Sequence, residues 1–361
     1  MSHGVSMTDG ILDEALQRLS RTGPERAGWL SNHAPMAAEA LVRHGHEMMV
    51  HRWLDGYADN LTEAPRGIEP IAPAEWRDPL GDPTRTGDWV DFFDRELTGA
   101  PWREVLAIWW PRLLPGIAAG ATHGVIRVGH AVRSLLESET EPRVTELGRG
   151  LAYWAARWQP LAPAGLGPYP AGDPRRALDA VPRVPDQRFG ARNRLAQLAD
   201  LSGWPPAAGA VPGTGEEVVR LRGIVTAAIK RYERYGYGSP IMLVHAATAP
   251  AAVLRSLPAL PAQLAGPSLR AAWAATAAVT AAYSPAVPRP TGAPTTAALR
   301  AVRPDAPATD PVGLMDEAAA TGDPHAIKFA DAAVEAWAVD PDPALLAAAA
   351  GANRLISADS R

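Results

Sequence analysis

The chain has 361 residues, of which 47% are hydrophobic and 20% charged, and its formal net charge at pH 7 is −4. It contains no cysteine, which excludes disulfides, zinc–thiolate sites, iron–sulfur clusters and cysteine nucleophiles, so any metal must bind through nitrogen and oxygen ligands. No basic patch interleaved with aromatic residues appears, and we therefore expect no nucleic acid partner.

The first residues, MSHGVSMTDGILDEALQRLS, lack the apolar run of a secretory signal. No later stretch approaches a membrane span. We therefore expect a cytoplasmic protein that does not bind membranes. A compact chain of this length buries roughly three quarters of its unfolded surface, which allows a closed interior site.

Helical periodicity dominates the chain in segments rich in Ala, Leu and Arg, several of which begin after Ser, Thr, Asp or Pro. The predicted helices, in chain order, are 8–21, 34–44, 46–58, 102–114, 117–137, 143–158, 215–234, 239–249, 267–283, 313–320, 324–338 and 342–350. No alternating run of β-branched residues predicts a strand. The predicted fold class is therefore mainly α.

Long stretches rich in Pro and Gly separate these helices, and loops of this length usually carry function or wrap the surface. They are residues 61–90, 160–174, 204–215 and 284–295. The stretch near 160–214 is the best candidate for a boundary between lobes, but histidines lie on both sides of it. We therefore predict one large multi-helical domain, 1–361, with a site assembled from distant segments.

The first informative histidines lie in SNHAPMAAEAL and GATHGVIRVGHAVR. Asn32 or Ser31 can cap the first of these helices, which places His33 in its first turn. In the second segment His123, Arg127 and His130 follow at i, i+4 and i+7, a polar stripe on an apolar helix. Such a stripe either faces a cavity or ligand, or hydrogen-bonds to neighbouring groups, and the sequence leaves both alternatives open.

Two further histidines lie in the second half of the chain. His245 stands in the apolar run IMLVHAATA, which indicates burial, and a buried histidine is more often a hydrogen-bonded core residue than a ligand. In DPHAIKFADAAVEAW, His325 precedes Lys328 by three residues, so both occupy one face of a helix. Lys328 is one of only two lysines, Lys230 being the other, in a chain that otherwise uses arginine. On an exposed helix it would pair with Asp323 or Asp331.

Standard signatures are absent from the sequence. It has no H-E-x-x-H motif, no EF-hand loop, no P-loop, no G-x-G-x-x-G following a strand and no G-x-S-x-G elbow. The chain therefore offers histidines and one unusual lysine rather than a nucleotide cradle or a serine triad.

Four segments together resemble the questin oxidase-like family: SNHAPMAAEAL, GATHGVIRVGHAVR, VHAATAPAAVLR and DPHAIKFADAAVEA. The resemblance runs from about residue 30 to 340 and rests on four histidine-bearing segments in the right order. It implies oxidative cleavage of a fused aromatic polyketide such as an anthraquinone, in secondary metabolism. Its enzymology has been described both as a Baeyer–Villiger type oxygenase and as a nonheme iron dioxygenase.

In the dioxygenase description, four histidines and a lysine carboxylated on its side-chain nitrogen hold Fe(II). Carried onto this sequence, the resemblance implies His33, His123, His245, His325 and Lys328 as metal ligands. Beside these ligands, Arg127, His130, Arg133 and Asn32 are our candidates for residues that contact the substrate or orient the ligands. Imidazole and carboxylate ligands suit iron, and a carbamate would turn the lysine from a cation into an anionic oxygen donor.

The function that the resemblance implies is an Fe(II)/O₂-dependent oxygenase acting on an aromatic polyketide. A homodimer is among the expected partners. An NADPH-dependent Baeyer–Villiger oxygenase is the second alternative, although no dinucleotide fingerprint supports a tightly held flavin. A non-catalytic helical protein that binds a polyketide is the third.

Overall fold

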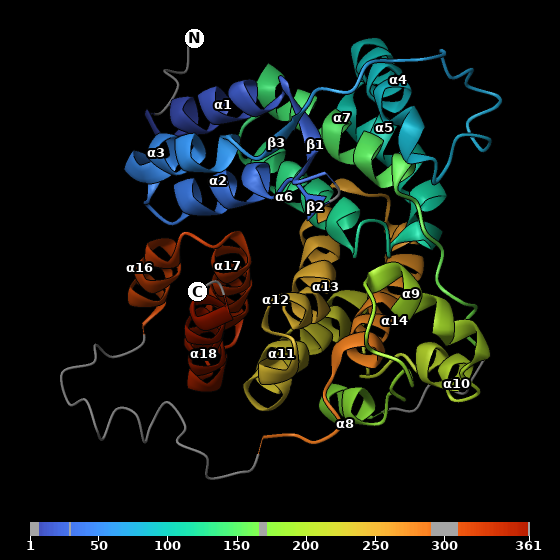
Figure 1. Cartoon of the computed structure of the whole chain (residues 1–361), viewed down its shortest axis with the longest axis vertical. Helices are drawn as coiled ribbons and strands as arrows, with labels where there is room; N and C mark the ends of the chain where they lie inside the picture. The colour runs from blue at the N-terminus through green and yellow to red at the C-terminus, as the bar shows by residue number, and fades with distance from the viewer. Residues whose placement is uncertain (1–6, 29, 166–171, 290–309, 360–361) are drawn as a thin grey trace. The chain divides into compact units, whose positions relative to one another are not determined.

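The computed structural model describes residues 7–28, 30–165, 172–289 and 310–359. It confirms a mainly α fold (Figure 1). The helices are α1 (Met7–Leu19), α2 (Ala34–Arg43), α3 (Glu47–Ala58), α4 (Thr86–Gly99), α5 (Trp102–Leu113), α6 (His123–Glu137), α7 (Glu141–Ala156), α8 (Pro174–Asp179), α9 (Ala191–Ala196), α10 (Trp204–Gly209), α11 (Glu217–Tyr235), α12 (Pro240–Leu243), α13 (His245–Ser256), α14 (Ala265–Tyr283), α16 (Pro311–Thr321), α17 (Pro324–Val339) and α18 (Pro343–Asp359).

A small antiparallel sheet accompanies the helices near the N-terminus. Its strands are β1 (Thr22–Arg26), β2 (Leu30–Ser31) and β3 (Leu61–Glu63), in the order β2-β1-β3. Glu25 of β1 lies opposite Ser31 of β2. The sequence did not predict these strands, because each is too short to show an alternating pattern.

The chain divides into two compact units. Unit 1 comprises residues 1–161 and 252–271, and unit 2 comprises 162–251 and 272–361. The first break lies within 160–214, where a lobe boundary was considered, and the interpretation as one domain stays a prediction.

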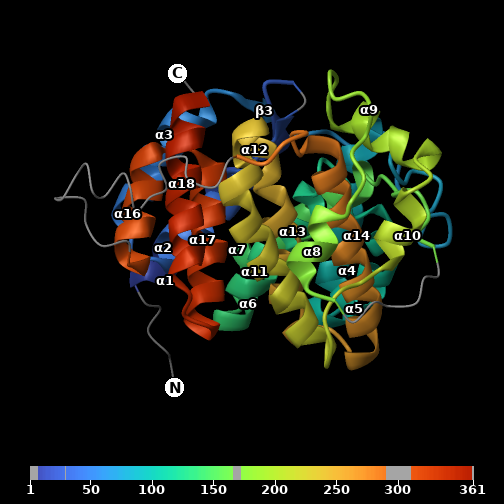
Figure 2. The same cartoon turned by 90° about the horizontal axis from the view of Figure 1, so that it is seen from below.

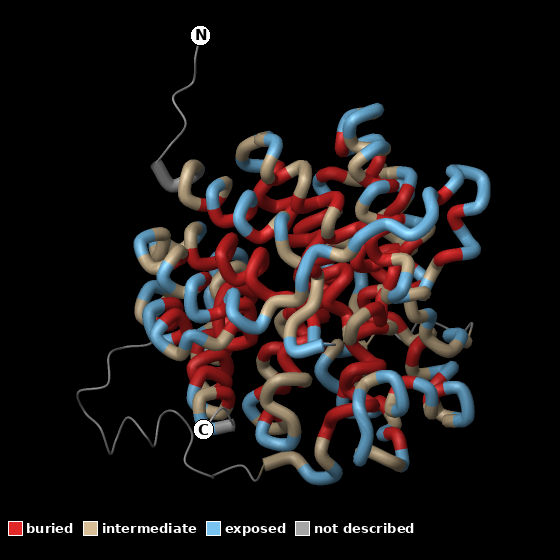
Figure 3. Tube along the Cα trace, turned by 45° about the horizontal axis from the view of Figure 1, so that its top comes forward, coloured by how far each residue is buried: buried red, intermediate tan, exposed pale blue. Residues whose placement is uncertain are grey.

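In unit 1, helices α1, α2 and α3 pack on one another, α2 packs on α6, and both α4 and α6 pack on α7. An aromatic cluster fills the core between α4 and α5: Trp109 lies edge-to-face against Trp89, Phe92 and Phe93, at centroid distances of 5.0–5.7 Å. Edge-to-face packing is the favoured geometry for such rings. Helix α6 is buried from His123 to Leu135, among the segments coloured red in Figure 3.

In unit 2, α17 packs on α18, α16 packs on both, and α11 packs on α17 and α18 (Figure 2). Helix α17 is buried over its first ten residues, from Pro324 to Ala333. Its N-terminal half is therefore a core element of this unit rather than a surface helix.

Several predicted helix boundaries were wrong: the segment predicted as 239–249 forms α12 and α13 and runs to Ser256, and the helix predicted at 342–350 continues to Asp359. A wrong start and a missed helix have identifiable reasons. The helix predicted from residue 117 begins only at His123, because Gly120, Ala121 and Thr122 all have positive φ, which ends right-handed helical geometry. Helix α4 was missed because its start lies in the Pro/Gly-rich stretch 61–90. The short helices α8 and α10 begin in two further stretches of this kind, 160–174 and 204–215.

The expectation that no stretch approaches a membrane span was too strong. Among the described residues, Pro240–Ala259 is long and apolar enough to cross a membrane by length and composition, with a mean hydropathy of 1.3. However, 72% of that window is buried inside the structure, as in the core helix of a soluble protein. The fold is thus compatible with a soluble protein.

Close packing along α6 generates a stability prediction. A Cβ on Gly129 would lie 2.6 Å from Cα of Ala252, a backbone atom that can move only if its helix moves. We therefore expect Gly129→Ala to lower the free energy of unfolding by about 1–3 kcal/mol. Gly56→Ala in α3 is the control: a Cβ there meets nothing within 4 Å, and the substitution should raise stability by about 0.5–1 kcal/mol. Urea unfolding measures both, and equal effects at the two positions would contradict the packing argument.

Candidate metal centre

A strained turn places His123 at the start of α6. Gly120, Ala121 and Thr122 have φ values of 53°, 56° and 74°. A Cβ on Gly120 would lie 2.6 Å from Oη of Tyr153, so any larger residue there would displace the Tyr153 side chain. Non-glycine residues in this region cost of order 1–3 kcal/mol each and persist only where the surrounding structure holds them. The turn ends with the carbonyl oxygen of Gly120 2.6 Å from Nδ1 of His123.

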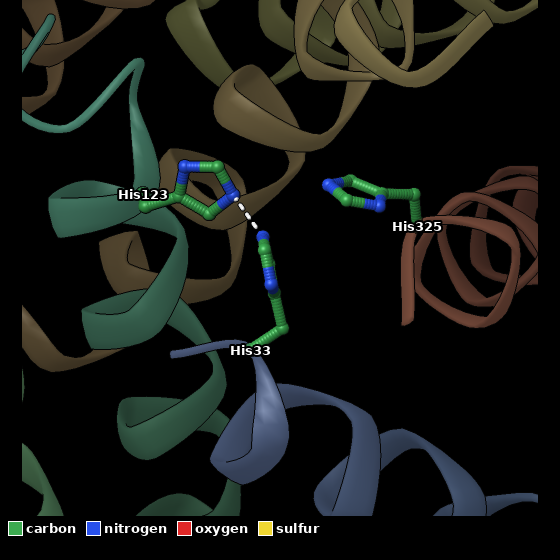
Figure 4. Close-up of side chains that lie close together, drawn as sticks. All are labelled: His33, His123 and His325. Atoms are coloured by element: carbon green, nitrogen blue, oxygen red, sulfur yellow. Dashed lines mark hydrogen bonds between the residues drawn. The ribbon is translucent and has the colours of Figure 1, made fainter. Parts of the chain in front are cut away.

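This contact determines which nitrogen His123 presents. A carbonyl oxygen only accepts, so neutral His123 donates from Nδ1 and carries its lone pair on Nε2. That lone pair faces Nε2 of His33 at 2.7 Å, with the rings nearly perpendicular at 71° (Figure 4). Either a proton or a cation must lie between two such nitrogens. Adjacent ligands on a metal with bonds of 2.0–2.1 Å would lie about 3 Å apart, close to the observed spacing.

His33 is the N-cap residue of α2 and is fixed by its neighbours. Its backbone N–H donates to Oη of Tyr57 at 3.0 Å, and its Nδ1 lies 3.3 Å from the same oxygen. Asn32, which was predicted as a cap or substrate contact, accepts from the Ala34 amide and donates to the carbonyl of Gly23. The side chain of Asn32 thus ties the start of α2 to β1.

In unit 2, His325 lies in the first turn of α17, where Figure 4 shows its ring projecting from the helix. Gly322 ends α16 in the left-handed region at φ 68°, and Asp323 caps α17 by accepting from the amide of His325 at 2.7 Å. The same carboxylate oxygen lies 3.1 Å from Nδ1 of His325. The cap therefore also orients the ring.

His245 begins α13 and is fully buried. Its Nδ1 lies 3.1 Å from the carbonyl oxygen of Met242, and its ring centroid lies 5.5 Å from that of His325. Burial, with the nearby charges of Lys328 and His325, lowers the pKa of His245 well below its ordinary value. His245 is thus a neutral imidazole at pH 7, the form that binds metals.

Lys328 lies within this unit as a fully buried residue, so the alternative of an exposed, solvated helix face is wrong. Among the described residues, its Nζ has no hydrogen-bond partner. Burial lowers the pKa of Lys328 to about 7, although the charge of Asp323 opposes the shift. A buried amine without a partner is costly, and such groups call for an explanation.

The four histidines share one arrangement, in which Nδ1 lies against an oxygen. The partners are Tyr57 for His33, Gly120 for His123, Met242 for His245 and Asp323 for His325. Metal-binding histidines show this pattern, because a hydrogen bond at one nitrogen fixes the tautomer and leaves the other as the ligand atom. The structure thus brings His33 together with His123 in unit 1, and His245 with His325 in unit 2.

The polar stripe of α6 binds carboxylates from neighbouring helices. Arg127 donates to both oxygens of Glu146, at 2.5 and 2.8 Å. Arg133 donates to Glu39, which also accepts from Nδ1 of His130 at 2.7 Å. A role of Arg127, His130 and Arg133 toward a substrate or a ligand stays a prediction.

Glu39 is the centre of this buried network. Burial raises its pKa, but the charges of Arg133 and His130 outweigh that effect and lower the pKa to about 2. Arg255 donates to Nε2 of His130 at 2.9 Å, which leaves Nδ1 as the donor to Glu39. Burial and the charge of Arg255 lower the pKa of His130 to about 4. His130 is therefore neutral in the folded protein at pH 7.

Sequence reasoning missed several partners of these residues, namely Glu39, Tyr57, Glu146, Asp323 as a ring-orienting group, and Arg255. Only Glu39 gave a usable signal, since it is a single carboxylate within the apolar run APMAAEAL and must be paired if that helix is buried.

Comparison with known families bears on the first half of this site. The questin oxidase-like family matches residues 30–137, which confirms the resemblance over a segment containing His33 and His123. The description of this family names an oxidase, so the match supports an oxidoreductase. No curated protein matches the chain.

The lowered pKa of His130 predicts a pH dependence of stability. Between pH 6.5, its ordinary pKa, and pH 4, the unfolded chain binds a proton that the folded chain does not. Stability therefore falls as the pH falls through this window. His130→Gln removes that proton, so the stability advantage of the wild type over the variant should shrink by up to about 1.4 kcal/mol per pH unit. Urea unfolding at pH 7, 6 and 5 measures this, with His51→Gln as the surface control. Parallel curves for wild type and His130→Gln would refute it.

Proposed function

We propose, on the premise of the family match over residues 30–137, that this chain is a nonheme iron-dependent oxygenase. Its proposed reaction is oxidative C–C cleavage of a polycyclic aromatic polyketide of the anthraquinone type, with O₂ as co-substrate, in the cytoplasm. The observation that carries the proposal is the pair of His33 and His123, whose Nε2 atoms face each other at 2.7 Å while Nδ1 of each lies against an oxygen.

The proposed ligands are four imidazoles and one carboxylated amine. They are His33, His123, His245, His325 and Lys328. The donor set fits Fe(II), which binds imidazole and carboxylate oxygen and does not require the thiolates that this chain lacks. The Nδ1 contacts of His123, His245 and His325 support it, because oxygens that only accept keep these three imidazoles in the tautomer that offers Nε2.

Lys328 is suited to carboxylation by its surroundings. The reaction needs the neutral amine, and the pKa of about 7 leaves a large neutral fraction at physiological pH. The amine nitrogen forms a bond to the carbon of CO₂ and releases one proton, which leaves a carbamate anion. Binding of that anion to the metal would account for the burial of Nζ, which has no hydrogen-bond partner among the described residues.

Iron, when bound, would supply the binding and activation of O₂, and the chain would supply the surroundings. Gly120 and Tyr57 hold His123 and His33 in place, and Asp323 holds His325. Burial of His33, His123 and His325 keeps bulk water away from the three rings. Arg127, His130 and Arg133 are proposed to orient the site or the substrate, and a need for NADPH as reductant and assembly as a homodimer stay predictions.

Metal content is the first test. We expect the purified protein to hold about one iron per chain, and His123→Ala and His325→Ala to reduce it at least tenfold, because each removes an imidazole ligand. His51→Ala, on the exposed face of α3, is the control and should keep the metal. Elemental analysis of proteins with matching circular dichroism measures this. No stoichiometric transition metal in active wild-type protein would refute the proposal, and activity that needs NADPH but survives chelation would favour the Baeyer–Villiger alternative.

Carboxylation of Lys328 is the second test, and the only other lysine provides a matched control. Protein equilibrated with ¹³C-bicarbonate should show a carbamate carbon resonance that Lys328→Arg abolishes, since a guanidinium stays protonated. Lys230, which pairs with Asp342, should be replaceable by Arg without loss of the signal. A resonance that survives in Lys328→Arg would exclude this residue as its source.

A further inference from the structure

A hollow on unit 1 lies apart from the histidines. It opens to solvent beside α5, has a volume of about 470 Å³, and is here called the Trp76 hollow. Its lining residues are Trp76, Arg77, Ile108, Pro111, Arg112 and Pro115. Ligand pockets in proteins commonly have volumes of about 300–1,000 Å³, so a small organic molecule fits this space.

Two guanidinium groups lie over the ring of Trp76, which lines the hollow. Cζ of Arg77 lies 4.3 Å from the Trp76 ring centroid, and Cζ of Arg112 lies 4.9 Å from it. Arg112 also lies 4.7 Å from the ring of Trp109. A cation–π contact uses no N–H···O hydrogen bond, so the N–H groups of both arginines can still donate to other partners.

The N–H groups of Arg77 and Arg112 have no acceptor within the part of the chain that the structure describes. Over residues 7–28, 30–165, 172–289 and 310–359, neither guanidinium donates a hydrogen bond or forms an ion pair. Elsewhere in unit 1 the buried arginines Arg127 and Arg133 are each held by a carboxylate. The arginines of the Trp76 hollow differ in this respect from Arg127 and Arg133.

The two arginines also repel each other. Burial and the nearby charge of Arg77 lower the pKa of Arg112, and only Glu96 is close enough to offset part of this effect. One oxygen of Glu96 accepts from Nε1 of Trp109 at 3.3 Å. Two cations near one carboxylate leave about one positive charge uncompensated, which suits a monoanion.

The rim of the hollow is apolar. Ile108 is 48% exposed, and Pro111 and Pro115 are exposed beside it. Rigid apolar side chains next to a cationic pair favour a ligand with a charged end and a hydrophobic body.

We propose that the Trp76 hollow binds a small aromatic carboxylate. The carboxylate would accept hydrogen bonds from Arg77 and Arg112, and the ring would lie against Ile108, Pro111 and Pro115. Arginine is the residue best matched to carboxylate geometry, because its N–H groups form a planar fork. The inference is independent of the metal centre and of the proposed reaction.

The test uses 2-naphthoate as the probe, titrated into the full chain by calorimetry. We expect Arg77→Gln and Arg112→Gln each to weaken binding at least tenfold, because each removes a charged hydrogen-bond donor. Arg103→Gln is the matched control: Arg103 also lies on α5 and stacks on a tryptophan, with its Cζ 4.2 Å from the Trp102 ring, but it does not line the hollow. It should change the affinity less than twofold.

Two further probes separate the chemical contributions. Neutral 2-naphthylmethanol should bind at least tenfold more weakly than 2-naphthoate, and inorganic phosphate should not compete with the probe at equal concentration. Binding of 2-naphthoate that is unchanged in Arg77→Gln would overturn the proposal, as would equal affinity for the alcohol or for phosphate. Because Arg77 is exposed, its substitution tests the site even if Arg112→Gln fails to fold.

Discussion

An imidazole has two nitrogens, and a hydrogen bond at one of them decides what the other can do. In this chain three histidines are constrained in this way, because Nδ1 of His123 and of His245 faces a backbone carbonyl and Nδ1 of His325 faces a carboxylate. The two carbonyls come from residues three positions before their histidines, Gly120 and Met242, so the local turn sets the tautomer. The strained turn before α6 thus has a structural role: it orients His123 so that its Nε2 faces His33.

The buried charges show two opposite solutions to desolvation. Glu39 is fully paired: it binds Arg133 and His130, which more than offset the cost of removing a carboxylate from water. Lys328 has no hydrogen-bond partner among the described residues, and its pKa falls instead, so that a large fraction of the amine is neutral at pH 7. The first solution makes a buried network of paired charges, and the second leaves a partly neutral amine in the core.

The sequence predicted the features that depend on local interactions and missed those that depend on contacts between distant residues. Periodicity and capping residues are local, and they predicted the mainly α fold and the position of α17 to within a residue at each end. The wrong prediction of a helix over 117–122 also concerns local structure. Ala and Thr rarely adopt positive φ, so nothing in the sequence indicates that Ala121 and Thr122 do. Partners such as Tyr57, which lies 24 residues from His33, depend on tertiary packing that periodicity does not encode.

Helix α13 has a consequence for the order in which the chain can fold. The boundary between the units falls inside this helix, between residues 251 and 252, and unit 1 contains the later segment 252–271. A ribosome therefore finishes 1–161 and must add the 90 residues of 162–251 before the rest of unit 1 exists. At ordinary elongation rates this takes roughly 5–20 s, which is long compared with helix formation. During that interval the close packing surface at Gly129 has no Ala252 to meet. Unit 1 is thus completed only as synthesis nears its last quarter, and a fragment that stops at residue 161 lacks part of its own core.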